Sequence, residues 1–445
     1  MRYARKIINL QSNHLEMKKF SLYSIALIGY IAFAQQVPAA KQTKTIAITN
    51  ATIHIGNGNV IKNGTVIFAD GKIIEVSSTT PTKSDLIEVI DATNQHVYPG
   101  FIAPNSTLGL VEIDAVKASD DESEIGAFNP HIRSIIAYNP ESKIIETARQ
   151  NGILMAQITP RGSRIAGTSS VVQLDAWNWQ ESILKENDGI HIEFPQTFRR
   201  SGWWAEPGAN EVNKEYIKQI DDLNTFFADA RAYNLEKSNQ VNLVYQAMNG
   251  LFNNTEILYI HADNQKQIID AVGFANKNKI KKMVIVGGYE AYKVADVLVE
   301  NEIAVLLKNP HNLPENAEQD VNLPYKNAKL LFDKGVLFAL ENSGSKERMN
   351  TRNLPFLAGT CAAFGIEKEA ALKLITSNSA KILGIDAQCG SLEVGKDATL
   401  FLSKGDALDM RTNKVVSAFI QGRKISLKSH QTELEKNYKT KYGQQ

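Results

Sequence analysis

Hydrophobic and polar positions follow three patterns along the chain, and the first lies between residues 44 and 98. Short runs there, such as residues 45–49 and 51–55, alternate apolar and polar side chains, which is typical of strands with one buried face. Asp70-Gly71 separates two further runs and predicts a tight hairpin. We therefore expect a small sheet of short strands in this part of the chain.

The second pattern extends from about residue 99 to residue 387. Almost wholly apolar segments are separated by stretches with helical spacing; these segments are 153–158, 257–261, 283–288, 303–307 and 336–340. Strands that alternate with helices in this way predict a parallel α/β barrel of the (β/α)8 (TIM) type. Residues 210–248 are polar over most of their length and predict a helix or helix pair with a solvated face.

The third pattern is one apolar run at residues 20–34, preceded by Met17-Lys18-Lys19 and closed by Ala32-Phe33-Ala34. A basic start, a short apolar core and a small-x-small site predict a secretory signal peptide, with Met17 as the initiator and residues 1–34 as an upstream extension plus signal. A membrane anchor is the alternative, but a spanning helix needs roughly 20 apolar residues. We expect an exported, periplasmic protein with no stable membrane span.

The composition limits the classes of partner. Hydrophobic residues make up 43% of the 445 positions, enough for a substantial core. Lysine and arginine number 49 against 48 aspartates and glutamates, so the formal net charge of +1 gives no reason to expect nucleic acid as a partner. Cys361 and Cys389 can pair in an oxidising compartment or remain buried thiols, because their spacing fits no motif.

Motifs at both ends of the predicted barrel resemble the amidohydrolase superfamily. Tyr98-Pro99-Gly100-Phe101-Ile102 is similar to the start of the first barrel strand in that superfamily. Asn378-x-Ala380-x-x-Leu383-Gly384, followed by the Gly-Ser-Leu-Glu-x-Gly-Lys run at 390–396, is similar to its C-terminal signature. The resemblance implies a TIM-type barrel at residues 99–387, and a small β-sandwich formed by residues 44–98 and 388–425. Residues 426–445 are then a polar tail.

The later strands most resemble the imidazolonepropionase-like branch of the superfamily. Strand five of that branch carries His-Ala-His, and this chain has His261-Ala262-Asp263. The strand-six histidine corresponds to Gly287, and the strand-eight aspartate to Glu341, or to Asn342 after a one-residue shift. The Asp-Ala-His-x-His of strand one corresponds to residues 103–107, which places Asn105 and Thr107 at the two histidine positions.

The resemblance implies hydrolysis of carbon–nitrogen bonds other than peptide bonds, in small amides or cyclic imides, by a metal that lowers the pKa of water towards ~7. Three histidine positions are changed, so His261 is a metal ligand only if a metal is bound. We expect either no cofactor or a weakly bound divalent metal, with zinc as the first candidate. Glu341 is the candidate catalytic carboxylate. The candidate pocket residues are Asn105, Thr107, His261, Asp263 and Asn342.

Two functions follow from this interpretation. One is a hydrolase that keeps a weak metal site, and the other, which is slightly favoured, is a catalytically inactive protein that binds a small ligand or regulates a partner. A homo-oligomer and a complex with an intact amidohydrolase are both compatible with the second function. The rim loops that select a substrate carry no recognisable motif.

Three further segments have open interpretations. His191 and Glu193 alternate on an apolar stretch, which places both on one face of a strand and makes them candidates for a rebuilt metal site. The Arg/Trp-rich segment 197–208 forms either a binding surface or a loop packed on the barrel rim. The acidic segment 112–124 is either a calcium loop or, without a glycine-centred ligand pattern, a solvated loop.

Overall fold

The chain is described by a computed structural model of residues 37–79, 86–203, 205–236, 240–342 and 347–444. The signal peptide expected at residues 1–34 lies outside the described residues. In the described part of the chain, no helix is long and apolar enough to cross a membrane.

The predicted barrel is confirmed as an eight-stranded sheet in the order β15-β14-β13-β12-β9-β8-β7-β6. Its strands are β6 (Phe101–Ser106), β7 (Ile153–Ile158), β8 (Ile165–Gln173), β9 (Ile183–Glu193), β12 (Ile257–Ala262), β13 (Met283–Gly287), β14 (Ala304–Leu307) and β15 (Phe338–Leu340). Alternate side chains of each strand face opposite sides. Tyr259 and Val284 therefore pack inside the barrel, whereas Leu258 and Ile285 pack against the helices outside it.

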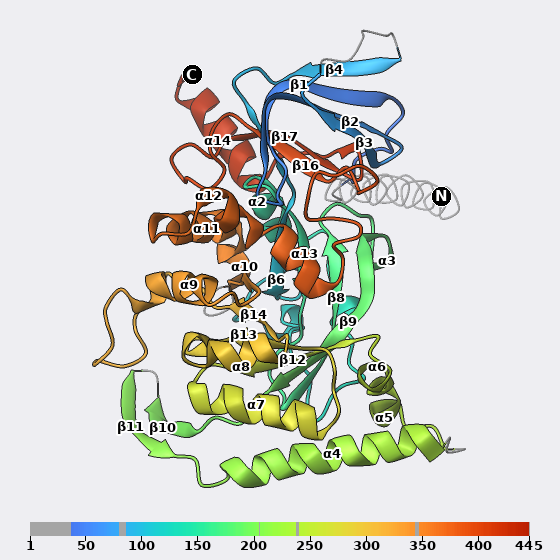
Figure 1. Cartoon of the computed structure of the whole chain (residues 1–445). Coiled ribbons are helices and arrows are strands. Elements are labelled where there is room, and N and C mark those ends of the chain that lie inside the picture. Colours follow the sequence, from blue (N-terminus) through green and yellow to red (C-terminus); the bar gives the residue numbers. More distant parts are fainter. Residues whose placement is uncertain (1–36, 80–85, 204, 237–239, 343–346, 445) are drawn as a thin grey trace, which may run out of the picture. The chain divides into compact units, whose positions relative to one another are not determined.

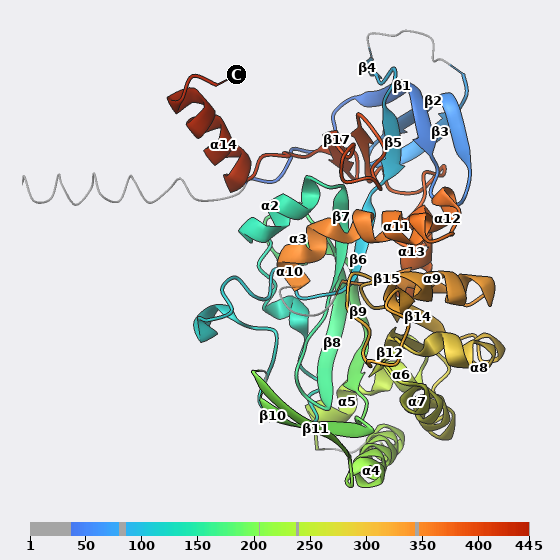
Figure 2. The same ribbon diagram turned by 90° about the vertical axis from the view of Figure 1, so that its left-hand side faces the viewer.

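One barrel strand differs from the parallel arrangement that the sequence predicts. β8 runs antiparallel to both of its neighbours, β7 and β9. Only residues 159–164 connect β7 to β8. A connection this short can reverse the chain into an antiparallel neighbour, whereas a parallel neighbour needs a crossover of about a dozen residues or more. Figure 2 shows β8 and β9 side by side as the longest strands of the sheet.

Helices surround the barrel (Figure 1). They are α2 (Lys143–Arg149), α3 (Trp179–Ser182), α4 (Tyr216–Glu236), α5 (Leu243–Ala247), α6 (Asn249–Phe252), α7 (Gln265–Lys277), α8 (Ala295–Glu300), α9 (Leu323–Asp333), α10 (Glu347–Asn350), α11 (Leu354–Ala363), α12 (Lys368–Lys373) and α13 (Ser377–Leu383). Short 3-10 turns are η1 (Lys117–Ser119), η2 (Ser134–Ile136), η3 (Ala291–Val294) and η4 (Thr351–Asn353). The polar segment 210–248 contains the predicted helix pair, α4 and α5.

A second eight-stranded sheet joins strands from the two ends of the described chain (Figure 1). Its strands are β1 (Thr45–His54), β2 (Val60–Ala69), β3 (Lys72–Ser77), β4 (Ile87–Asp91), β5 (His96–Pro99), β16 (Leu400–Ser403), β17 (Val415–Ile420) and β18 (Arg423–Lys424). The junction between the two segments is the antiparallel pair β5–β16, in which Tyr98 lies opposite Phe401.

This composite sheet curls around a core of its own. Phe68 of β2 and Phe419 of β17 contact edge to face at 5.1 Å, although three strands separate β2 from β17 in the sheet order. The predicted hairpin at Asp70-Gly71 is confirmed, since both residues have positive φ and connect β2 to β3. A hairpin turn of this type matches the twist of its two strands.

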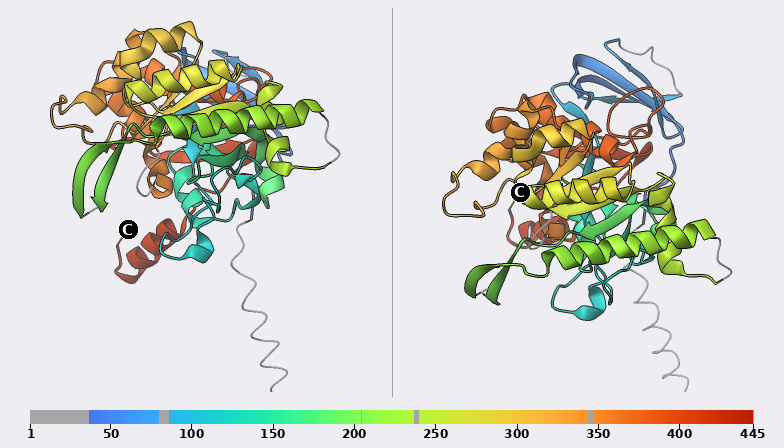
Figure 3. Two further views of the ribbon diagram at one scale, coloured as in Figure 1. Left: turned by 90° about the horizontal axis from the view of Figure 1, so that it is seen from below. Right: turned by 60° about the horizontal axis from the view of Figure 1, so that its bottom comes forward.

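The Arg/Trp-rich segment is a hairpin rather than a loop. β10 (Phe198–Trp203) pairs antiparallel with β11 (Glu206–Val212), and the two strands project beside α4 in both views of Figure 3. Phe198 and Trp203 are more than half exposed, so they are not packed on the barrel rim. Trp204 lies outside the described residues.

The remaining predictions concern the cysteines and the C-terminal tail. Cys361 and Cys389 are separate, buried free thiols. The polar tail contains α14 (His430–Lys441), which buries no residue and begins with a capping box formed by Ser429 and Thr432. The tail is therefore helical over residues 430–441.

Candidate functional site

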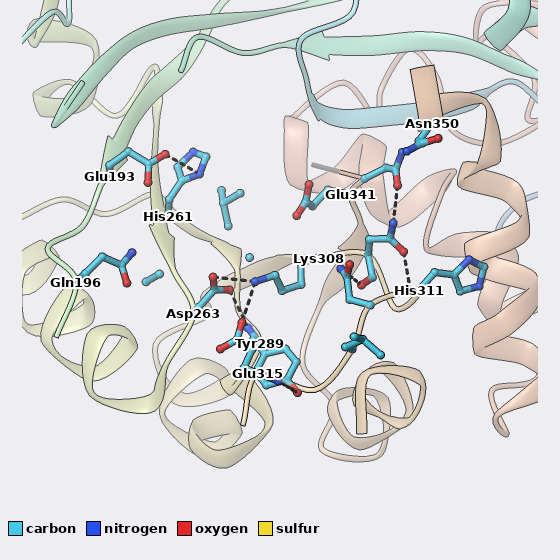
Figure 4. A pocket seen from close by; sticks show the side chains of 17 residues that line it. Glu193, Gln196, His261, Asp263, Tyr289, Lys308, His311, Glu315, Glu341 and Asn350 are labelled. Atoms are coloured by element: carbon cyan, nitrogen blue, oxygen red, sulfur yellow. Dashed lines mark hydrogen bonds and ion pairs between the residues drawn. The ribbon is translucent and has the colours of Figure 1, made fainter. Parts of the chain in front are cut away.

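A pocket of about 720 Å³ lies at the carboxyl ends of the barrel strands (Figure 4). It is lined by residues that end or follow β9, β12, β13, β14 and β15; they include Glu193, His261, Asp263, Gly287, Lys308, Glu315, Glu341 and Asn342. Barrel proteins carry their active sites at this end because the strand-to-helix loops converge there. The pocket is therefore the candidate functional site.

Four of the residues predicted from the sequence line this pocket, and two lie behind it. His261, Asp263, Glu341 and Asn342 contribute to the wall. Asn105 lies behind Glu341 and donates a hydrogen bond from Nδ2 to its Oε2 over 3.3 Å. Thr107 is buried and donates from Oγ1 to Glu347 Oε1 over 2.8 Å. The six predicted residues thus belong to one cluster, but not all of them can touch a ligand in the pocket.

An arginine lies where Asn105 and Thr107 converge. Arg161 Nη2 is 3.0 and 3.1 Å from the two carboxylate oxygens of Glu347, and Nη1 is 2.9 Å from Asn105 Oδ1. Burial opposes the charge of Arg161, but the carboxylates of Glu347 and Glu341 outweigh it and raise the pKa of the guanidinium. A fixed cation therefore lies directly behind the pocket.

His261 is held between two protein groups. Its Nδ1 is 3.4 Å from Glu193 Oε1, and its Nε2 is 3.0 Å from Nδ1 of His191. A proton on Nδ1 satisfies Glu193 and leaves Nε2 to accept from His191 N–H, so one tautomer satisfies both contacts. Both ring nitrogens of His261 therefore face protein groups in this arrangement. The sequence prediction that His191 and Glu193 share a face is consistent with these contacts.

The polar chain continues from His191 into the barrel interior. His191 Nε2 is 3.0 Å from Ser169 Oγ, and Ser169 Oγ is 3.4 Å from Asp188 Oδ2. Asp188 is buried and accepts from Gln157, Tyr259 and Lys185 over 2.6 to 2.8 Å. Burial lowers the pKa of His191, and the neighbouring His261 and Arg161 lower it further. Burial likewise lowers the pKa of His261, against the opposing effect of Glu193.

Asp263 occupies the space beside Gly287. Gly287 has φ +92°, and a Cβ added there would lie 2.6 Å from Asp263 Oδ1. Lys308 holds Asp263 in place through Nζ, 2.9 Å from Oδ2, and also contacts Glu315 Oε1 at 3.1 Å. The strand-six position therefore has neither the backbone conformation nor the space for a histidine while Asp263 stays where it is.

The family resemblance implies a metal, which would need several donor side chains to lie close together among the described residues. No group of three or more His, Cys, Asp or Glu side chains that could hold a metal ion is found among them. A catalytic zinc normally takes three protein ligands. Here His261 is engaged by Glu193 and His191, and Glu341 accepts a hydrogen bond from Asn105.

Sequence reasoning missed Arg161, Glu347 and Lys308. Lys308 had a usable signal, because it directly follows the apolar segment 303–307 and so falls at the carboxyl end of a predicted strand. Arg161 and Glu347 are 186 positions apart, and no spacing rule connects them. Their pairing is visible only in the folded chain.

Comparisons of the sequence identify its relatives. The profile described as "Amidohydrolase family" matches residues 186–425. An imidazolonepropionase of Symbiobacterium thermophilum is 26% identical over 389 residues, which cover 77% of this chain and 84% of that protein. An imidazolonepropionase of Flavobacterium psychrophilum is 25% identical over 187 residues, which cover 38% of this chain and 46% of that protein. The second match thus spans less than half the length of that relative.

Solved structures show the same fold. An amidohydrolase from Thermotoga maritima superposes with a TM-score of 0.75 at 24% identity, over 86% of this chain and 99% of that chain. A molinate hydrolase superposes with a TM-score of 0.51 at 14% identity, over 88% of this chain and 96% of that chain. At these identities the likeness concerns the fold alone.

Proposed function

Because the chain belongs to the amidohydrolase family, in its imidazolonepropionase-like branch, we propose that its barrel pocket binds a small polar molecule, and that it does so without a metal ion. Barrel pockets at the strand ends are the usual place for ligands in this fold. The family supports the location of the binding site, and the polar side chains of the pocket support the binding of a polar molecule.

The observation that carries the proposal is the position of His261. It is the one residue that retains a family histidine among the positions compared, and its ring nitrogens face Glu193 and His191 rather than the open pocket. A metal there would have to displace one of these contacts. It would then need further donors, which Asn105 and Thr107 do not supply because they contact Glu341, Arg161 and Glu347.

The pocket residues can bind a polar ligand by hydrogen bonds. Glu193, Glu341 and Asp263 offer carboxylate acceptors, and the amides of Asn309, Asn342 and Asn350 offer both donors and acceptors. Asn309 and Asn342 are already bonded to each other over 2.9 Å, which holds the amide wall in place. Such a pocket selects a molecule by its polar groups and not by its apolar area.

Hydrolysis of a carbon–nitrogen bond is the second candidate function. Two relatives carry the name imidazolonepropionase, and Glu341 lies in the pocket after β15, where the branch has its catalytic aspartate. A carboxylate there can take a proton from an attacking water. This candidate requires either a metal or another way to activate the water.

Metal content separates the two candidates. The full mature chain, purified without chelator, is expected to contain well under one equivalent of zinc, manganese or iron by elemental analysis. Small amides, dipeptides and cyclic imides are then tested by thermal shift and for hydrolysis, with and without added zinc. Stoichiometric metal together with chelator-sensitive hydrolysis overturns the proposal in favour of the hydrolase.

Two pocket variants test the ligand site itself. His261→Ala and Glu341→Gln should abolish the response to ligand, whereas His430→Ala and Glu433→Gln, both on the exposed face of α14, should not. If the pocket variants respond like the wild type, the pocket is not the binding site and the proposal is wrong.

We extend the proposal to export and to partners. The apolar run at residues 20–34 supports export, and mass spectrometry of protein from the native host should find a chain that begins after residue 34. A partner-regulating role predicts that an intact amidohydrolase co-purifies with the chain, and that His261→Ala reduces its recovery. An N-terminus that retains residues 1–34 argues against export.

A further inference from the structure

A second cavity, of about 840 Å³, lies at the opposite end of the barrel from the candidate site. It is lined by the amino ends of β12, β13 and β14 and by the segments that lead into two of these strands, residues 279–282 and 301–303. Barrel enzymes carry their catalytic groups at the carboxyl ends of the strands. A ligand in the second cavity is therefore not in contact with the candidate site.

Lysine side chains dominate the charge of this cavity. Three of them lie in one short run, Lys279-Ile280-Lys281-Lys282, which leads from α7 into β13. Lys185 of β9 and Lys381 of α13 line the cavity as well. Among the described lining residues, Glu302 carries the one opposing charge. A cavity with walls of one sign concentrates ligands of the opposite sign.

Four of the five ammonium groups are not engaged by the protein. Lys185 Nζ donates to Asp188 Oδ1 over 2.8 Å and to the backbone oxygen of Leu383 over 2.7 Å, so it is committed. The other four lysines are exposed, and within the described ranges their side chains form no hydrogen bond or ion pair. These four can reach a ligand without first breaking a contact within the protein.

The helices that end at this cavity do not use these four lysines as caps. Cations are common at helix C-termini because they interact with the last carbonyl groups. Here the residues that follow α7, α8 and α13 donate backbone N–H groups to such carbonyls over 2.8 to 3.0 Å; the pairs are Ile280 to Ala275, Ile303 to Leu298 and Ile385 to Ala380. Capping therefore does not explain the lysines.

The floor of the cavity is apolar. Seven of the residues that line it are Ile257, Met283, Val284, Ile303, Ala304, Leu337 and Ile382. These side chains are buried or half-buried, whereas the four uncommitted lysines are exposed, so the lysines form the rim. Asn276 and Asn301 add amide groups that can donate hydrogen bonds. A basic rim above an apolar floor matches a molecule with a negative head and an apolar body.

We propose that this cavity binds a small organic carboxylate with an apolar body, such as an aryl or alkyl carboxylate. The carboxylate accepts hydrogen bonds from Lys281 and Lys282 at the rim, and the apolar body covers the floor. Charge-assisted hydrogen bonds of this kind are roughly twice as strong as neutral ones. The inference does not rest on the proposed function, because the two cavities share no lining residue in the part of the chain that the structure describes.

The test uses probes that separate the charge from the apolar body. Phenylacetate, phenylacetamide and 2-phenylethylammonium share an aromatic body and differ in charge, whereas acetate has the charge without the body. Each is titrated into the full mature chain by calorimetry at low and at high salt. Phenylacetate should bind at least tenfold more tightly than the other three probes, and its affinity should fall as salt rises.

Variants locate the binding of phenylacetate. Lys281→Gln/Lys282→Gln should weaken it at least tenfold, because both substitutions remove a charge from an exposed side chain at the rim. Lys436→Gln/Lys441→Gln, on the exposed helix α14, removes the same charge elsewhere and should bind like the wild type. His261→Ala, at the other end of the barrel, should also leave the affinity for phenylacetate unchanged.

Other outcomes overturn the inference. If acetate binds as tightly as phenylacetate, the apolar floor has no role, and if phenylacetamide does, the lysines have none. Loss of binding in His261→Ala assigns the carboxylate to the candidate site instead. Vesicles of phosphatidylglycerol and phosphatidylcholine are tested by co-sedimentation, and a chain that binds them but not phenylacetate has a membrane-binding face here. If phenylacetate does not bind at all, the inference is wrong.

Discussion

Nδ1 of His191 lies 3.0 Å from Nε2 of His261, so a buried imidazole and a partly exposed one that lines the pocket share one hydrogen bond. Only one of the two nitrogens can carry the proton of that bond, and a positive charge on either ring is opposed by burial and by Arg161 nearby. The pair is therefore a neutral unit whose proton arrangement is determined by Glu193 at one end and Ser169 at the other.

Acid should destabilise the fold through these histidines. Their pKa values are lowered in the folded chain, so below the unfolded value of about 6.5 the unfolded chain takes up protons that the folded chain does not. The free energy of unfolding should therefore fall between pH 7 and pH 5, by at most about 1.4 kcal/mol per pH unit for each histidine. His191→Gln should reduce that slope in urea titrations, and the exposed His430→Gln should not. Equal slopes in wild type and His191→Gln contradict the prediction.

Gly287→Ala should destabilise the barrel at the strand-six position. The positive φ and the approach to Asp263 both oppose a side chain, and we expect a loss of about 1 to 3 kcal/mol in the free energy of unfolding. Gly273→Ala, on the exposed face of α7 with no atom within 4 Å of the new Cβ, should instead stabilise by up to about 1 kcal/mol. Chemical denaturation measures both. If the two variants behave alike, Asp263 does not restrict position 287.

Arg161→Met should cost more stability than the loss of one surface ion pair. It removes the guanidinium from a carboxylate that is only 9% exposed, and breaking a buried pair in this way costs about 3 to 5 kcal/mol. The double variant Arg161→Met/Glu347→Gln should recover part of the loss, because it removes the remaining charge. Lys218→Met, which breaks an exposed pair with Asp222, is the control and should leave the unfolding midpoint unchanged. If the stability losses caused by the two substitutions simply add in the double variant, Arg161 and Glu347 are not a coupled pair.

Glu256→Gln should stabilise the chain in alkaline solution. Burial, reinforced by the charge of Asp188, raises the pKa of Glu256 to about 7 in the folded chain. Because its pKa is raised in the folded chain, the carboxyl group of Glu256 favours folding at pH values below its unfolded-chain pKa of about 4.3. That contribution is lost as the pH rises to about 7. Between pH 4.5 and pH 8, the free energy of unfolding of the variant should rise by on the order of 1 to 3 kcal/mol relative to that of the wild type, as measured by urea denaturation. Glu433→Gln should show no such trend, and a pH-independent difference contradicts the assignment.

The fold was largely predictable because its signals are local. The Asp-Gly turn at residues 70–71, the apolar strand segments and the motifs at both ends of the barrel each depend on neighbouring residues, and all correspond to elements of the structure. The reversed strand β8 also had a local signal in the short connection at residues 159–164, but the regular alternation elsewhere favoured a parallel neighbour.

The interior of the candidate site was less predictable because its contacts join distant residues. Correspondence with family motifs identified His261 and Glu341 by position, and both line the pocket. It could not show that Arg161 reaches Asn105, or that Asp263 fills the space beside Gly287, because these contacts depend on side-chain directions at three strand ends. Metal binding at this site depends on the directions of these side chains as well as on the residue types.

The β5–β16 pairing makes the order of synthesis matter for this protein. When β5 leaves the ribosome, its partner strand is about 300 residues from being made, and the whole barrel is translated in between. Until then β5 has an unpaired edge on that side, and the apolar face that later meets Phe401 has no cover. Closing so long a loop is slow. The nascent chain therefore carries an aggregation-prone edge through most of its synthesis, and a chaperone that shields β5 is expected to raise the yield of folded protein.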